Sequence, residues 1–244
     1  MTIYHTLNKK QSWYGQSIGI LTPNTFYPCI PGNVANATTF PFPVRYKIVE
    51  KASVERILKE KDRTLLSPLI DAAIELQNEG VKAITGTGGI MTLFQKEVSD
   101  VIGVPVFLSS LLQIPFIYQT IKRPIGIITS DSRCLTPDYF ISIGVNREIP
   151  LAIRGMEGQK EFREAILEEK GSLDSARIEK EVVGVAKQLI TENFDMGAVL
   201  LECGDLSPYA YAVQKELSLP VFDFITMIHY VHSALIRTEF QGFM

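Results

Sequence analysis

The chain repeats its own residue pattern at a fixed spacing of 115 positions, and this repeat limits the folds that it can adopt. The segment "VKAITGTGGIMTLFQKEVSDVIGVPVFLS" returns without an insertion as "MGAVLLECGDLSPYAYAVQKELSLPVFDF". An earlier segment, "QSIGILTPNTFYP", is echoed by "RPIGIITSDSRCLTP". The matched positions of the longer repeat include Ala83 with Ala198, Gly89 with Gly204, Val98 with Val213 and Pro105 with Pro220. The repeat predicts two similar structural units.

Each unit alternates apolar runs of strand length with longer amphipathic segments. In the first unit, strands are predicted at 17–23 and 44–49 and in "VKAIT" and "VPVFL", and helices in "TLLSPLIDAAIELQNEG" and at 111–122. This alternation is typical of parallel α/β sheets. We therefore predict an α/β fold of two pseudo-symmetric halves, each a mostly parallel sheet flanked by helices. Their bounds are 1–122, joined by a C-terminal helix at 225–244, and 123–224. Ligands of such sheets bind beyond the carboxyl ends of the strands, so a cleft between the halves is the predicted site.

The repeat pairs Gly88 with Cys203, which makes Cys203 the one cysteine at a repeat-matched position. It follows the predicted strand "GAVLLE" and precedes a helix that Ser207 is predicted to cap. Backbone N–H groups and the helix dipole would lower the pKa of a thiol there and favour the thiolate. The alternative is that Cys203 only packs at a strand end. Cys29 and Cys134 lie in the loops after the first strands and are interpreted as bystanders.

The glycine-rich turn "GTGG" also precedes a predicted helix and offers N–H donors to a carboxylate or phosphate. The alternative is a tight turn that needs positive φ. Nucleotide binding is not expected, because the turn lacks the Gly-Lys-Ser/Thr of a P-loop and the third glycine of a dinucleotide motif. Polar loops after the first strands, "TPNT" and "TSDS", would reach the same cleft. The predicted substrate-binding residues are Thr22, Asn24, Thr25, Thr87, Gly88, Gly89, Ser130, Ser132, Gly204 and Asp205.

Charge and hydropathy exclude other classes of function. With 24 basic and 27 acidic residues, the chain shows no basic excess of the kind that binds nucleic acid. No apolar run approaches the roughly 20 residues of a membrane-spanning helix, and the N-terminal "MTIYHTLNKKQSWYGQ" lacks the apolar core of a signal peptide. We therefore expect a cytoplasmic protein with no membrane or nucleic-acid partner.

Two further features are open to interpretation. His229 and His232 are three residues apart on a late helix without an acidic third ligand nearby, so no metal site is predicted and an inter-domain or hydrogen-bonding role is favoured. The Pro- and Asn-rich segment 24–43 is long for a plain connection and is predicted to be a lid or a substrate-facing loop.

Segments spread over nearly the whole chain resemble the aspartate/glutamate racemase superfamily, which includes hydantoin racemases, maleate isomerases and arylmalonate decarboxylases. They are "IPGNVANATTFPFPVRYKIVE", "AIT..GGIMTLFQ", "VPVFLSSLLQIP", "SRCLTPDYF", "LLECGDLSPYA" and "LPVFDFITMIH". The bacterial aspartate/glutamate racemase-like branch is the most similar. The resemblance implies no cofactor, a small carboxylate or amino-acid substrate, a homo-oligomer in many members, and two cysteines that flank the substrate α-carbon.

The chain departs from that pattern at Gly88, where members usually show the first cysteine, while Cys203 is retained. A glycine supplies no proton, and inversion of a stereocentre needs a donor on each face. The leading expectation is an isomerase of the amino-acid racemase type with Cys203 as acid and base; Thr87 or Asp205 could supply the second proton. The alternatives are a single-cysteine decarboxylase of a malonate-type acid and a carboxylate-binding protein without turnover.

Overall fold

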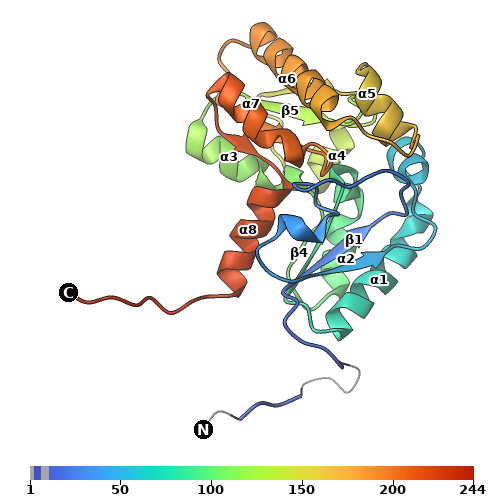
Figure 1. Ribbon diagram of the computed structural model, residues 1–244, viewed down its shortest axis with the longest axis vertical. Coiled ribbons are helices and arrows are strands. Elements are labelled where there is room, and N and C mark those ends of the chain that lie inside the picture. The colour runs from blue at the N-terminus through green and yellow to red at the C-terminus, as the bar shows by residue number, and fades with distance from the viewer. Residues whose placement is uncertain (1–2, 7–10) are drawn as a thin grey trace.

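The computed structural model describes residues 3–6 and 11–244 and, for Ile90, the backbone only. Residues 1–2 and 7–10 lie outside the described residues. They belong to the predicted first half and to the N-terminal segment that lacks the apolar core of a signal peptide. The described chain forms two four-stranded parallel sheets with helices around each of them (Figure 1). The predicted α/β fold of two pseudo-symmetric halves is confirmed.

The two sheets have the same strand order. The first is β2-β1-β3-β4, formed by β1 (Ile18–Thr22), β2 (Val44–Ile48), β3 (Ala83–Gly86) and β4 (Val106–Phe107). The second is β6-β5-β7-β8, formed by β5 (Ile125–Thr129), β6 (Leu151–Gly155), β7 (Ala198–Leu201) and β8 (Val221–Phe222). Even the register agrees, since Ile18 lies opposite Ala83 and Ile125 lies opposite Ala198. The repeat in the sequence is therefore a repeat in three dimensions.

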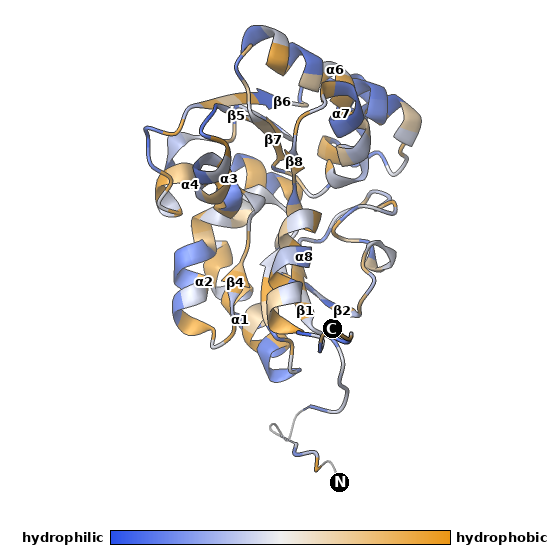
Figure 2. Cartoon of the chain, turned by 90° about the vertical axis from the view of Figure 1, so that its left-hand side faces the viewer, coloured by the Kyte–Doolittle hydropathy of each residue, from blue (hydrophilic) through white to orange (hydrophobic). Residues whose placement is uncertain are grey.

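The helices cover the faces of these sheets. They are α1 (Leu66–Asn78), α2 (Gln95–Val101), α3 (Ile114–Ile121), α4 (Pro137–Ser142), α5 (Lys160–Phe162), α6 (Ser175–Glu192), α7 (Ala210–Leu217) and α8 (Phe224–Leu235). In α6 the buried residues Ile178, Val182, Val185, Ala186 and Leu189 recur at helical spacing and form one apolar stripe toward the sheet. Figure 2 shows the hydrophilic residues of α6 and α7 at the outer surface. Among the helices of the described ranges, none is both long enough and apolar enough to cross a bilayer.

The C-terminal helix α8 returns to the first sheet. Its Phe224, Met227 and Ile228 are buried in one cluster with Ile18 and Ala83 of that sheet. The helix ends at Leu235, nine residues before the predicted bound of 244. The exact domain bounds stay predictions.

The two histidines of α8 pack against the long loop. The His232 ring stacks on Phe42 at a centroid distance of 3.5 Å, and the His229 ring meets Phe42 at 5.5 Å with an edge-on geometry. Both histidine rings therefore contact the aromatic ring of Phe42. No group of three metal-ligating side chains occurs within the part of the chain that the structure describes.

The start of α8 depends on one carboxylate. Asp223 accepts a hydrogen bond from the N–H of Thr226 at 2.8 Å, and Thr226 Oγ1 accepts from the N–H of Asp223 at 3.0 Å. We expect Asp223→Ala to lower the free energy of unfolding by about 1–2 kcal/mol, because the Thr226 N–H loses its acceptor. Asp223→Asn keeps an acceptor and should stay within about 0.5 kcal/mol of the parent. Urea unfolding measures both; equal losses in the two variants would contradict the capping role.

Candidate active site

The centre of the site is a direct contact between the two repeat-matched turns. Gly88, after β3, lies opposite Cys203, after β7, in an isolated antiparallel bridge. The N–H of Gly204 donates to the carbonyl of Thr87 at 3.2 Å. A Cβ on Gly204 would lie 2.5 Å from that carbonyl oxygen, so a side chain there would push the two turns apart. The positions that the sequence pairs at a spacing of 115 therefore also face each other in the fold.

The glycines of "GTGG" serve close approach rather than an unusual backbone. Gly88 has φ −136° and ψ 136°, an extended conformation that any residue adopts. None of Gly86, Gly88 and Gly89 has positive φ, so the tight-turn alternative is wrong. A Cβ on Gly89 would instead collide with the carboxylate of Glu202. The turn leads into a 3-10 helix, Gly89–Phe94, before α2 begins.

The predicted helix cap beside Cys203 is wrong. Ser207 opens a short 3-10 turn, Ser207–Tyr209, whose N-cap is Leu206 without a side-chain hydrogen bond, and α7 begins only at Ala210. No helix N-terminus therefore lies next to the thiol, and the dipole argument for a lowered pKa fails. Burial instead raises the pKa of Cys203 well above its ordinary value, and the charges of Asp205 and Glu202 add to this. The resting group is a thiol.

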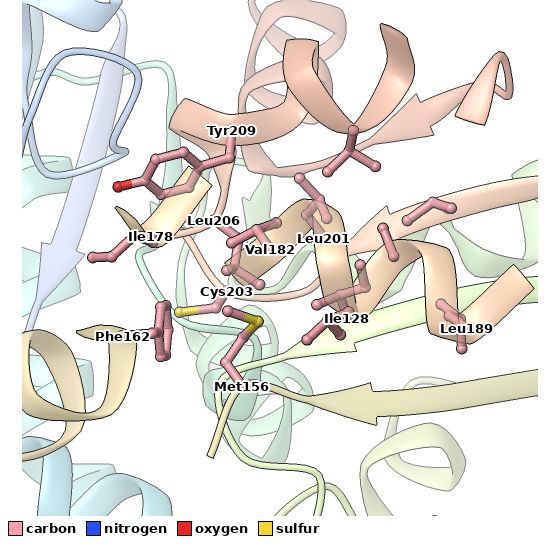
Figure 3. Close-up of a cluster of buried hydrophobic side chains, with 14 of the residues drawn as sticks. Ile128, Met156, Phe162, Ile178, Val182, Leu189, Leu201, Cys203, Leu206 and Tyr209 are labelled. Atoms are coloured by element: carbon pink, nitrogen blue, oxygen red, sulfur yellow. The ribbon is translucent and has the colours of Figure 1, made fainter. Parts of the chain in front are cut away.

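Cys203 lies where an apolar core meets a polar network. It belongs to the buried cluster that also contains Met156 and Phe162 (Figure 3). Its Sγ donates to Asp205 Oδ2 at 3.3 Å. This contact gives the thiol proton a carboxylate acceptor within one hydrogen bond.

Asp205 is in turn held by the long loop of the first half. Tyr27 donates its hydroxyl to Asp205 Oδ2 at 3.1 Å, and Asn33 donates its amide to Oδ1 at 2.7 Å. The loop closes on the second half at Gly32, where φ is 96° and a Cβ would lie 2.8 Å from Pro208 Cα. Burial raises the pKa of Asp205, and the hydrogen bonds from Asn33, Cys203 and Tyr27 oppose this rise. The loop thus contributes Tyr27 and Asn33 to the site, two residues that the sequence did not single out, and its role as a lid or substrate-facing segment stays a prediction.

A second carboxyl, Glu202, was also missed. It ends the buried run before Cys203, is 2% exposed, and accepts a hydrogen bond from Thr129 Oγ1 at 2.7 Å. Burial raises its pKa to about 7. An acidic residue at the end of an otherwise apolar strand was the signal that could have identified it.

These groups surround a cleft of about 520 Å³, a volume that includes its solvent-open mouth. Its lining residues are Pro23, Tyr27, Val54, Ile57, Leu58, Thr87, Gly88, Gly89, Met91, Ser130, Ile166, Leu167, Glu202, Cys203 and Asp205. Among the described residues that line the cleft there is no lysine, arginine or histidine. Without a basic side chain in this lining, the carboxylate of Asp205 gives the cleft a negative potential.

Six of the eleven predicted site residues line the cleft: Thr87, Gly88, Gly89, Ser130, Cys203 and Asp205. Gly204 stands behind them in the contact between the turns. The other four lie elsewhere. Thr22 bonds the carbonyl of Pro23, the exposed Asn24 bonds Ala52 through its backbone, Thr25 is absent from the lining, and Ser132 donates to Glu157 Oε1 at 2.5 Å. The catalytic and binding roles of the eleven residues stay predictions.

Solved structures place the chain in a known class of fold. A liganded double mutant of arylmalonate decarboxylase superposes with a TM-score of 0.64 at 13% sequence identity, covering 90% of this chain and 92% of that one. Allantoin racemase from Pseudomonas fluorescens gives a TM-score of 0.64 at 16% identity, covering 90% and 91%. The fold is therefore that of the two-domain, aspartate/glutamate racemase-like proteins. The replacement of a cysteine by Gly88 stays a prediction.

Sequence relatives narrow this class. A dimethylsulfoniopropionate lyase from Durusdinium sp. clade D is 30% identical over 217 residues, which cover 86% of this chain and 71% of that protein. Dimethylsulfoniopropionate lyase 3 of Emiliania huxleyi (strain CCMP1516) is 29% identical over 221 residues, covering 86% of this chain and only 57% of its relative. No family model matches the chain. The chain belongs to the dimethylsulfoniopropionate lyase family.

This membership corrects the predicted function. The relatives are enzymes, as expected, but their names describe lyases, and they contradict an amino-acid racemase as the main function. The expected cytoplasmic location, the homo-oligomer and the absence of nucleic-acid and membrane partners stay predictions.

After burial, the charge of Asp205 is the next cause that raises the pKa of Cys203, so we expect it to limit the reactivity of the thiol. Because a neighbouring carboxylate disfavours the thiolate, Asp205→Asn should lower the pKa of Cys203 and speed its alkylation by iodoacetamide at pH 8 roughly tenfold. Peptide mass spectrometry follows each cysteine separately. Cys134 is the internal control, since its pKa responds to Asp131 and other local charges rather than to Asp205. Slower alkylation of Cys203 in the variant would contradict the electrostatic coupling.

Proposed function

We propose that the protein is a lyase that cleaves dimethylsulfoniopropionate, or a close sulfonium analogue, by β-elimination with Cys203 as the base. Family membership supports the class of reaction. The observation that supports this substrate is the charge of the cleft, in which the carboxylate of Asp205 lies beside Cys203 and no basic side chain lines the described wall. A sulfonium cation is attracted by such a cleft, whereas the second carboxylate of a dicarboxylic amino acid is repelled.

The reaction is balanced with the groups present. Asp205 accepts the proton of the Cys203 thiol through their existing hydrogen bond. The thiolate then takes a proton from the carbon next to the substrate carboxylate. The electron pair of that C–H bond forms the new double bond, the C–S bond breaks, and its pair leaves with sulfur. Neutral dimethyl sulfide and the acrylate anion are the products, Cys203 is again a thiol, and Asp205 releases the proton that it accepted to the solvent.

The positive charge of the substrate favours ionisation of the base, Cys203. In the resting site, burial and the neighbouring carboxyls keep the pKa of Cys203 high. A bound sulfonium next to the sulfur lowers the pKa of Cys203 and so favours the thiolate, whose proton passes to Asp205. The thiolate therefore forms when the substrate is present, which limits side reactions of the thiol in the empty site.

One thiol is sufficient for elimination. Racemisation must return a proton to the face opposite the one from which it was taken, but elimination removes a proton once. Gly88 then needs no acid or base function. The hydroxyls of Thr87 and Ser130 and the backbone at Gly88 and Gly89 are proposed to hold the substrate carboxylate, and the ring of Tyr27 is proposed to face the sulfonium.

The role of Cys203 is tested by Cys203→Ala, with Cys134→Ala as the matched control. We expect the first to reduce kcat for release of dimethyl sulfide from dimethylsulfoniopropionate by about 10²–10⁴-fold, because the general base is lost. The second should stay within twofold, since Cys134 does not line the cleft. Headspace gas chromatography measures the product. Undiminished release by Cys203→Ala would refute the assigned base, and no release by the wild type would refute the proposed function.

The charge preference is tested without turnover. 3-(Trimethylammonio)propionate keeps a cationic group but has a poor leaving group, and 4,4-dimethylpentanoate is its isostere with an uncharged tert-butyl group in place of the cation. We expect the cationic compound to bind at least about tenfold more tightly, and Asp205→Asn to reduce this ratio, because the carboxylate attracts the cation. Calorimetry gives both dissociation constants. Equal affinities in the wild type, or tighter binding of aspartate, would contradict a cation-selective cleft.

A further inference from the structure

The buried carboxyl of Glu202 is not used by the base chemistry of Cys203. Its main chain is fixed, because its N–H donates to the carbonyl of Ile128 at 2.8 Å and its carbonyl accepts from Ser110 Oγ at 3.1 Å. Its side chain is 2% exposed and has no ion-pair partner among the described residues. An isolated ionised carboxylate in such a place is costly, so burial favours the protonated acid.

The two oxygens of this carboxyl have different neighbours. Oε2 accepts the hydrogen bond from Thr129 Oγ1. Oε1 lies against the backbone of Gly89, in space that a Cβ at that position would fill. The carboxyl therefore enters the cleft at the turn of the first half, beside Gly88 and Gly89, only because residue 89 is a glycine.

We propose that Glu202, in its protonated form, donates a hydrogen bond to the substrate carboxylate and stabilises the negative charge that enters it as the α-proton leaves. This inference rests on the proposed elimination. When a carbon next to a carboxylate loses its proton, the charge spreads onto the carboxylate oxygens, and a donor aimed at them lowers the barrier. Thr87 and Ser130 offer neutral hydroxyls only, and a neutral carboxylic acid in an apolar site is a suitable additional donor.

The electrostatic surroundings of Glu202 agree with this assignment. The titratable groups that face it are Tyr139 of α4 and, on its own turn, Cys203 and Asp205. Burial and the charge of Asp205 raise the pKa of Glu202 to about 7, while the hydrogen bond from Thr129 lowers it. A second carboxylate brought next to it raises this pKa further, because the two anions then share one proton. Binding of a carboxylate above pH 7 should therefore take up a proton.

The test uses acrylate, the product carboxylate, and requires no turnover. Calorimetric titration at pH 8 in two buffers of different ionisation enthalpy counts the protons taken up on binding. We expect an uptake of about nine-tenths of a proton by the wild type, because a group of pKa about 7 is mostly ionised at pH 8. Glu202→Gln keeps an N–H donor, should still bind acrylate, and should take up almost no proton. Asp223→Asn, which changes an equally buried carboxyl at the start of α8, should behave as the wild type.

A second measurement needs only the wild type. Its dissociation constant for acrylate should rise roughly tenfold per pH unit above pH 7, since the bound form needs the proton. Absence of proton uptake by the wild type, equal uptake by Glu202→Gln, or no binding of acrylate at all would overturn the inference. The lyase assignment is judged separately, by release of dimethyl sulfide. An active wild type that binds acrylate without proton uptake refutes the role of Glu202 alone.

Discussion

The contact between the two turns that follow β3 and β7 is the constraint on which the rest of the site depends. Gly88 faces Cys203, and the N–H of Gly204 bonds the carbonyl of Thr87. A side chain at 204 would break this contact, and one at 89 would displace Glu202. Glycine is thus required at 204 and 89 to let the two halves approach, and that approach brings the thiol of one half to the turn after β3 of the other. Each half alone holds only part of the site.

The fold could be predicted from the sequence because the repeat is uninterrupted. The spacing of 115 holds from Ala83 to Pro105, so once β3 is assigned, the positions of strand β7 and of the turn after it follow from it. Parallel strands buried on both faces give strong apolar runs, so β1 and β5 were also readily found. The pairing of Gly88 with Cys203 followed from the same register.

The missed parts of the site depend on contacts that no repeat encodes. Tyr27 and Asn33 lie in an irregular loop whose path is set by its docking on Pro208 and Asp205. Ser207 fitted the pattern of a helix cap, but the chain makes a 3-10 turn first, which removed the argument for an acidic thiol. The four predicted residues outside the cleft illustrate the same limit: Ser132, for example, is held by Glu157 of the neighbouring loop. Strand ends locate a site, whereas side-chain partners determine which residues face it.

The high pKa of Cys203 bears on why position 88, opposite this thiol, can be a glycine. A racemase needs a thiolate on one face and a thiol on the other before any substrate binds, and a cleft with two uncompensated carboxyls opposes that thiolate. An elimination enzyme with a cationic substrate has the opposite requirement, because the charge that favours the thiolate arrives with the substrate and departs as a neutral leaving group. The thiol is then protonated by the substrate proton, and the cleft regains its resting state when Asp205 releases its proton to the solvent, without a second proton donor. Gly88 and the carboxyls of Glu202 and Asp205 therefore have a common explanation. Carboxyls beside Cys203 disfavour a resting thiolate, which makes proton transfer on two faces unfavourable but suits a reaction that removes a proton from one face of the substrate.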